Sequence, residues 1–305
     1  MSAFVVLKQM IMMFLLIMTG YFLYKRRLIS SAASKDMSAL VVNVCSPALI
    51  ISSVLSGSVP ASRSSTGIVA LLAVCSYFIL IFLAYILVRL LRITIEQQDA
   101  YLLMTIFGNL GYIGIPVSMA VIGPESIIYV AIFNFISNVF LFTFGIKIIK
   151  KGTKESKNSW TDIFTPGFIS CMIAFVIYWF QIQVPADVIT LLHYFGDSCT
   201  MLSLLVIGMS LVGLNYMQMI TDRKMIFFIL IRFLLIPILA AVLIRMFITD
   251  YIMKATIVLM LSLPVANLPM MLLKRYGKET DAMSKGIIMT TICSIATISI
   301  VFLFV

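Results

Sequence analysis

Long apolar stretches alternate with short polar loops along the whole chain. A helix that crosses a bilayer needs about 20 mostly apolar residues, and runs of this length predict ten membrane-spanning segments. Their ranges are 3–24, 35–55, 66–91, 98–122, 126–149, 164–182, 190–214, 224–248, 251–273 and 283–305. Because backbone polar groups inside lipid must be paired within their own segment, the expected fold class is an all-α integral membrane protein.

Composition supports this class. Of the 305 residues, 62% are hydrophobic and 11% are charged, and the mean hydropathy is +1.13. Soluble domains have about half apolar and about a quarter charged residues. The apolar excess is too large for a water-soluble core, so the chain is expected to pass through a membrane several times.

The distribution of basic residues predicts the orientation. Most of the 22 Lys and Arg residues lie in the five loops that follow segments 1, 3, 5, 7 and 9. The opposite side holds only Lys8, Arg63, Arg245 and Lys254. Cytoplasmic loops are enriched in Lys and Arg, so both termini are expected on the side opposite the cytoplasm. The expected location of the protein is the plasma membrane. Basic loops also contact anionic lipid, so the net charge of +10 does not require a nucleic-acid partner.

One long polar stretch, KKGTKESKNSWTD at 150–162, divides the chain. It separates a first group of five segments, 1–149, from a second group of five, 163–305. An odd number of segments in each half inverts the second half relative to the first. We therefore expect two inverted five-helix repeats joined by a cytoplasmic linker, as in many secondary transporters.

Segment 4 contains the stretch GNLGYIGIP, which is unusual for the middle of a membrane helix. Gly108, Gly111 and Gly114 stand three residues apart, Asn109 follows the first of them, and Pro116 closes the stretch. Glycine leaves helical geometry cheaply, and proline removes a backbone donor and clashes with the preceding turn. The segment is therefore expected to be broken near its middle.

Segment 9, the counterpart of segment 4 in the second half, contains LSLPVANLPMML. Here Pro264 and Pro269 bracket Asn267. Corresponding broken segments in the two halves of a transporter point to its binding site. Two half-helices that begin at such breaks present free N–H groups to a common point, which favours an anion. The alternative is that these residues only kink the helices or let them pack closely.

Other polar residues inside the segments are weaker candidates. Asn43 and Pro47 in segment 2 and Asn134 in segment 5 could line a cavity, or could serve helix packing and interhelical hydrogen bonds. Arg232 is the one charge well inside a segment; it could add positive potential at a site or extend to the cytoplasmic interface. The candidate substrate-binding residues are Asn109, Asn267, Gly111, Gly114, Pro116, Pro264, Pro269, Asn43, Pro47, Asn134 and Arg232.

The residues of catalytic and metal chemistry are sparse. The five cysteines form no C-x-x-C pair, and His193 is the only histidine, so we expect no metal, no cofactor and no enzyme activity. All twelve Asp and Glu residues fall in loops or near segment ends, and Asp197 is the only one placed to reach inward. Coupling to an ion gradient is therefore not favoured, although a cation-coupled symporter of the bile-acid-transporter type is the main alternative.

Four motifs resemble those of the auxin efflux carrier family. GNLGYIGIP is similar to the family's N-x-x-x-x-G-I-P motif in span 4, and LPVANLPMMLLKRYG is similar to its span-9 motif. RFLLIP in segment 8 and NVCSPALIISS in segment 2 also resemble family patterns. The motifs occur in the family's order, and the resemblance covers the whole chain.

The resemblance implies a fold and a function. Spans 1, 2, 6 and 7 would form a scaffold, through which a homodimer could form, and spans 3–5 and 8–10 would form a transport domain in which spans 4 and 9 cross. The implied substrates are small organic anions: indole-3-acetate in plant PIN carriers, and malate or malonate in bacterial members. The implied mechanism is an elevator movement. An intramembrane enzyme and a non-transporting receptor are the remaining alternatives.

Overall fold

The computed structural model describes residues 3–56, 63–151, 166–210, 212, 222–276 and 278–305. Within these ranges every regular element is a helix, and the one β-type pairing is an isolated bridge between Gly108 and Val265. The predicted linker lies outside the described residues from position 152 onward, as does most of the end of predicted segment 7. The all-helical class predicted from the sequence is therefore confirmed.

The helices follow the predicted segments, either as single helices or as helices interrupted by a turn or a break. The first half contains α1 (Ala3–Lys25), α2 (Ser31–Leu40), η1 (Val41–Cys45), α3 (Ser46–Ser56), α4 (Arg63–Leu90), α5 (Ile95–Ile106), η2 (Leu110–Gly114), α6 (Ile115–Val121), η3 (Pro124–Ser126), α7 (Ile127–Phe140), η4 (Leu141–Gly145) and α8 (Ile146–Lys150). The second half contains α9 (Pro166–Phe180), α10 (Ala186–Ser210), α12 (Arg223–Ile229), η6 (Leu230–Leu235), α13 (Ile236–Phe247), α14 (Tyr251–Ser262), α15 (Asn267–Arg275) and α16 (Asp281–Val301).

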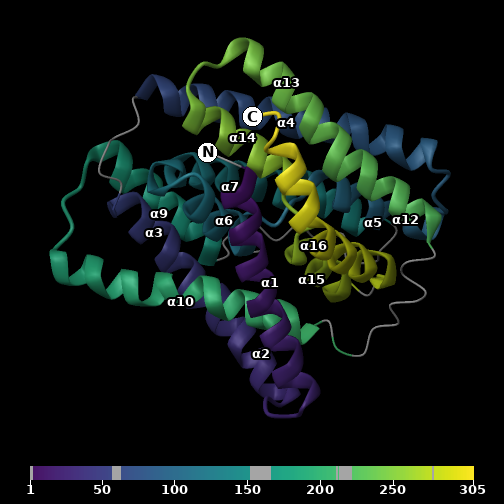
Figure 1. The fold of residues 1–305 in the computed structure, drawn as a ribbon, viewed down its shortest axis with the longest axis horizontal. Coiled ribbons are helices and arrows are strands. Elements are labelled where there is room, and N and C mark those ends of the chain that lie inside the picture. The colour runs from purple at the N-terminus through teal and green to yellow at the C-terminus, as the bar shows by residue number, and fades with distance from the viewer. Residues whose placement is uncertain (1–2, 57–62, 152–165, 211, 213–221, 277) are drawn as a thin grey trace.

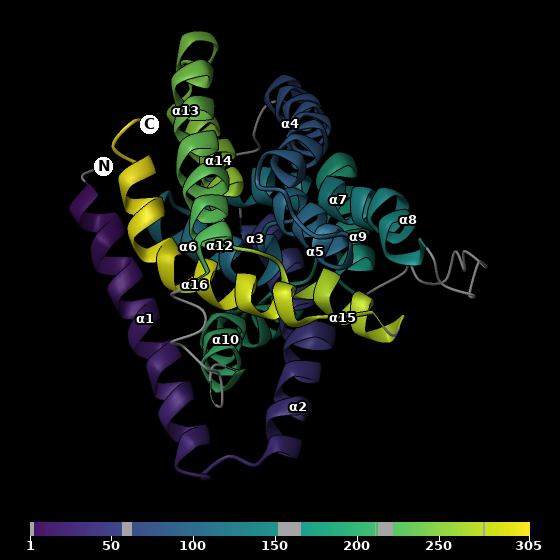
Figure 2. The ribbon, with the colours of Figure 1, turned by 90° about the vertical axis from the view of Figure 1, so that its right-hand side faces the viewer.

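Six of these helical stretches are long and apolar enough to cross a membrane, and three shorter apolar helices accompany them. Large apolar side chains such as Phe82 on α4, Phe180 on α9 and Phe247 on α13 point away from the protein, as expected for surfaces that face lipid. The start of α1 and the end of α16 lie near each other at one end of the molecule (Figures 1 and 2). The structure is that of a multi-pass membrane protein, and the count of ten spans stays a prediction.

Three prolines are each preceded by a π-helical turn. Pro47, Pro116 and Pro237 each lie two residues beyond the end of η1, η2 and η6, respectively. A proline inside a helix has no N–H group, and its ring clashes with the carbonyl one turn earlier. The wider π turn separates these groups, so each helix continues through its proline instead of ending there.

The helices pack in two groups. In one group, α1 and α3 pack against α10, and α9 packs against α3; in the other, α4 packs against α5 and α7, and α14 packs against α13 and α16. Helices α2 and α10 lie at the opposite end of the molecule from α4 and α13 (Figures 1 and 2). The two groups meet where α1 contacts α16 and where α7 contacts α9.

Helices α1 and α10 touch through their backbones. A Cβ atom added at Gly208 of α10 would lie 1.8 Å from the carbonyl oxygen of Ile17, and one added at Gly20 of α1 would lie 2.1 Å from that of Leu205. Small residues allow such close approach between membrane helices, where van der Waals packing replaces the hydrophobic effect as the source of association. These two glycines therefore set the geometry of the first helix group.

Candidate functional site

The two segments that were predicted to break do break, and their breaks touch. Helix α5 ends at Ile106 and the chain becomes helical again at Leu110, while α14 ends at Ser262 and α15 begins at Asn267. Residues 107–109 and 263–266 run antiparallel to each other, and this contact is called the crossing below. Four helix ends therefore come together at the middle of the two segments.

Two backbone hydrogen bonds join the crossing. The Asn109 N–H donates to the Pro264 carbonyl at 2.7 Å, and the Ala266 N–H donates to the Phe107 carbonyl at 3.1 Å. These bonds satisfy groups that a helix break would otherwise leave unpaired, at a depth where an unpaired group is costly. The Val265 N–H donates to the Thr290 hydroxyl of α16 at 3.1 Å, so a third element supports the crossing.

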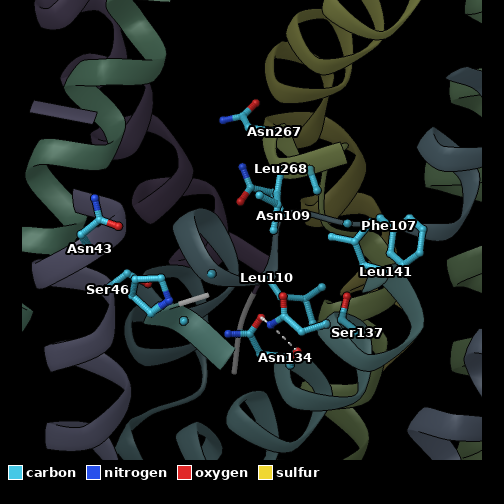
Figure 3. Close-up of a pocket in the computed structure, with 16 residues that line it drawn as sticks. Asn43, Ser46, Phe107, Asn109, Leu110, Asn134, Ser137, Leu141, Asn267 and Leu268 are labelled. Carbon is cyan, nitrogen blue, oxygen red and sulfur yellow. Dashed lines mark hydrogen bonds between the residues drawn. The ribbon is translucent and has the colours of Figure 1, made fainter. Parts of the chain in front are cut away.

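A pocket of about 290 Å³ lies beside the crossing. In Figure 3, Asn43 and Ser46 lie on one side of Asn109, and Ser137 and Leu141 lie on the other. The pocket is lined by Asn43, Ser46, Phe107, Gly108, Asn109, Leu110, Gly111, Asn134, Ser137, Asn138, Leu141, Pro166, Gly167, Ala266, Asn267 and Leu268. It therefore lies between the two helix groups, because η1, α3 and α9 contribute from one group and the broken segments and α7 from the other.

The lining is rich in amides, and none of its described residues has an ionisable side chain. Asn109 is 4% exposed and Asn134 is 9% exposed, and the Asn138 amide donates to the Asn134 carbonyl at 2.9 Å. An asparagine amide can offer two donors to a ligand oxygen. Phe107, Leu110, Leu141, Ala266 and Leu268 supply apolar walls. The pocket suits a small ligand with a polar, oxygen-rich end and an apolar body.

Two helical stretches begin at this pocket. The stretch of η2 and α6 begins at Leu110, and α15 begins at Asn267; both residues line the pocket. The first N–H groups of a helix have no partner within the helix, and each helix N-terminus carries about half of a positive charge. The electrostatic character of an otherwise uncharged pocket is therefore positive, which favours an anion.

Of the eleven residues predicted from sequence, the structure brings five together in the pocket. These are Asn43, Asn109, Gly111, Asn134 and Asn267. Five others do not line it: Pro47, Gly114, Pro264, Pro269 and Arg232; the side chain of Pro116 lies outside the part that the structure describes.

The prolines contribute unequally to the break. Pro264 lies in the crossing itself, where its carbonyl accepts the Asn109 hydrogen bond. Pro116 comes after the chain has become helical again, and Pro269 lies in the first turn of α15. In a first turn the missing N–H of proline costs nothing. The break in segment 4 is therefore at Gly108 and Asn109 rather than at Pro116.

Arg232 and Asp197 do not lie where one of the predictions for each placed them, and Gly114 has a packing role. Arg232 is 1% exposed and does not extend to an interface; its guanidinium donates to the carbonyls of Thr105 and Leu261, just before the crossing. Asp197 is exposed on α10 and does not line the pocket. Gly114 packs against Leu263, since a Cβ added there would lie 2.7 Å from the Leu263 Cδ1 atom.

Several residues that line the pocket are not among those predicted from the sequence. Ser137 and Leu141 follow Asn134 at spacings of three and seven residues, so the helical period could have placed them on the same face. Ser46 follows Asn43 at the same spacing of three residues. Pro166 and Gly167 gave no comparable signal, because they reach the pocket only through long-range packing. In the described part of the chain, no group of three or more His, Cys, Asp or Glu residues could hold a metal ion.

Broken helices that cross beside a pocket, in a helical protein with several membrane-capable segments, have the architecture of a membrane transporter. The chain matches the family model described as membrane transport protein over residues 5–302, and it belongs to this family, the auxin efflux carrier family. Members of the family are transporters and not enzymes. A comparison with curated proteins gave no match.

Proposed function

We propose that this protein is a plasma-membrane carrier for a small organic anion, and that the pocket at the crossing binds its carboxylate. The observation that carries the proposal is the pair of helical stretches that begin at Leu110 and Asn267, both at the pocket. The Leu110 N–H donates to the Gly108 carbonyl at 3.0 Å. The N–H groups that follow in the first turns and the amide of Asn109 suit carboxylate oxygens. The basic loops support an orientation with both termini outside the cytoplasm.

The charge balance of the pocket favours an anion with one negative charge. Each of the two helix N-termini supplies about half of a unit charge, so together they match one carboxylate. Among the lining residues that the structure describes, there is no lysine or arginine to balance a second one. We therefore expect a monocarboxylate with an apolar body to be bound better than a dicarboxylate of similar size.

The position of the pocket between the two helix groups supports an elevator mechanism. One wall comes from Asn43, Ser46 and the start of α9, and the other comes from the crossing and α7. If the group that holds the crossing moves against the first group, the bound anion moves with the asparagine amides that bind it. The wall that holds Asn43 stays in place. The close backbone contact of α1 with α10 suits a rigid first group.

Uptake into proteoliposomes tests the function and the charge selectivity together. The purified protein is reconstituted, and uptake of radiolabelled indole-3-acetate and malonate is compared with uptake by protein-free liposomes. We expect saturable uptake of the monocarboxylate, with the dicarboxylate competing at least about ten-fold more weakly because its second charge is uncompensated. Equal competition by both acids would contradict the charge match, and no protein-dependent uptake of either probe would contradict the carrier proposal.

A second prediction concerns the size of the pocket. A Cβ atom added at Gly111 would approach only the Ser46 Oγ atom, at 4.0 Å, so a side chain there fills open space in the pocket. Gly111→Val is therefore expected to raise the KM for uptake about ten-fold while changing the melting temperature little. The control is Gly67→Val on α4, where an added Cβ meets nothing within 4 Å. A wild-type KM for the Gly111 variant would show that the ligand lies elsewhere.

A further inference from the structure

Arg232 is the only charged residue among the buried polar side chains of the described chain, at 1% exposure. Its Nε–H group donates to the carbonyl of Thr105, and its Nη1–H group donates to the carbonyl of Leu261 at 2.8 Å. Its guanidinium carbon lies 4.9 Å from the centre of the Phe233 ring. Arg232 forms no ion pair with any described carboxylate, and a guanidinium stays protonated in proteins.

The two acceptors have equivalent positions. Thr105 is the penultimate residue of α5 and Leu261 is the penultimate residue of α14, so each carbonyl belongs to the C-terminal end of the first half of a broken segment. The last carbonyls of a helix lack intrahelical partners, and this end carries about half of a negative charge. Two such ends together carry about one negative charge, which a single guanidinium balances while its planar fork bonds both.

The four helix ends at the crossing therefore form two pairs of opposite partial charge. The two C-terminal ends face Arg232, and the two N-terminal ends face the pocket, which Arg232 does not line. In transporters with broken helices, free C-terminal ends and unwound carbonyls form the sites that bind a coupling cation such as Na⁺. Here two such carbonyls, those of Thr105 and Leu261, already accept hydrogen bonds from Arg232.

We propose that Arg232 is a positioning residue that serves as the resident cation of the crossing, so that anion binding and transport require no soluble cation. This inference rests on the proposed carrier function. Arg232 neutralises the carbonyl ends, which would otherwise repel a carboxylate in the neighbouring pocket. It acts through the two broken helices and does not touch the substrate.

The first experiment measures stability and needs no substrate. The melting temperature of purified Arg232→Ala is measured with guanidinium chloride and, separately, with urea, both far below the concentrations that unfold proteins. Arg245→Ala is the control, because Arg245 is exposed near the end of the same helix. We expect the Arg232 variant alone to melt several degrees lower and guanidinium, but not urea, to restore part of the loss. Equal effects of guanidinium and urea on this variant would overturn the proposal.

The second experiment measures uptake of radiolabelled indole-3-acetate into proteoliposomes. Replacing Na⁺ and K⁺ by N-methylglucamine is expected to leave wild-type uptake unchanged, and this measurement needs no variant to fold. Arg232→Lys, which keeps the charge, is expected to stay within a few-fold of the wild-type KM, whereas Arg232→Gln raises it at least about ten-fold. A requirement of the wild type for Na⁺, or equal KM values for the Lys and Gln variants, would overturn the proposal.

The two experiments separate this proposal from the carrier function. If neither indole-3-acetate nor malonate enters wild-type proteoliposomes, the carrier proposal fails, and guanidinium rescue in detergent then decides the role of Arg232 by itself. If uptake occurs but depends on Na⁺, the carrier proposal holds and the role of Arg232 as the resident cation is wrong.

Discussion

Gly208→Ala is expected to lower the yield of folded protein to a small fraction of the wild-type yield. The added Cβ atom would lie 1.8 Å from the Ile17 carbonyl oxygen, and real Cβ contacts are essentially never shorter than 3.0 Å. Backbone atoms of α1 cannot rotate away as a side chain can, so α1 and α10 must separate along their contact. Overpacking of this kind costs about 1–3 kcal/mol or more, a large part of the stability of most proteins. The fraction of monodisperse protein after extraction into detergent measures the loss.

Gly20→Ala and Gly67→Ala complete this comparison. Gly20 makes the reciprocal contact, at 2.1 Å from the Leu205 carbonyl oxygen, and its replacement should have a similar effect. Gly67 has open space around it on an exposed face of α4, and alanine there is expected to be neutral or slightly stabilising because it is the better helix former. A normal yield of Gly208→Ala would show that α1 and α10 do not meet through their backbones.

Asn109→Asp is expected to abolish transport and to leave the protein folded. The two side chains have nearly the same shape, and the hydrogen bond to Pro264 comes from the backbone N–H, which the substitution keeps. The new carboxylate would lie at the pocket where the helix N-termini meet, so it would take the place of the substrate charge. Adjacent like charges cost several kcal/mol, which corresponds to about a hundred-fold or greater loss of uptake.

Gln183→Glu is the matched control, because it makes the same change in charge at an exposed position between α9 and α10. Its uptake should equal that of the wild type. Asn109→Ala, which removes the amide without adding a charge, is also expected to abolish transport, and its folding is checked by its elution profile. Wild-type uptake by Asn109→Asp would place the anion away from this residue.

The sequence predicted the breaks because their cause is local. Glycine, proline and asparagine within an apolar run change the backbone wherever the run folds, so GNLGYIGIP and LPVANLP could be identified without contacts. The pairing of the two breaks was predicted from their matching places in the two halves of the chain. The structure places Asn109 and Asn267 in one pocket, as that reasoning expected.

The remainder of the site depends on packing between distant segments, which the sequence does not encode locally. Pro166 and Gly167 reach the pocket only because α9 packs against α3 and α7 beside the crossing. The sequence shows Arg232 as a charge in an apolar run, but its hydrogen-bond partners are backbone carbonyls, which every residue has. Sequence alone therefore could not show which carbonyls it binds. The prediction that Pro116 helps to break segment 4 was wrong, because a π turn lets the helix continue through this proline.

The bridge between Gly108 and Val265 has a consequence for biogenesis. Its two hydrogen bonds join residues from opposite halves of the chain, so they cannot form while only the first half has left the ribosome. Until segment 9 arrives, the broken helix of segment 4 has backbone groups that lipid cannot satisfy. The first half must then wait at the translocon, beside a chaperone or in contact with water. Synthesis of the chain as two separate halves should therefore leave the first one open to degradation unless the second is made alongside it.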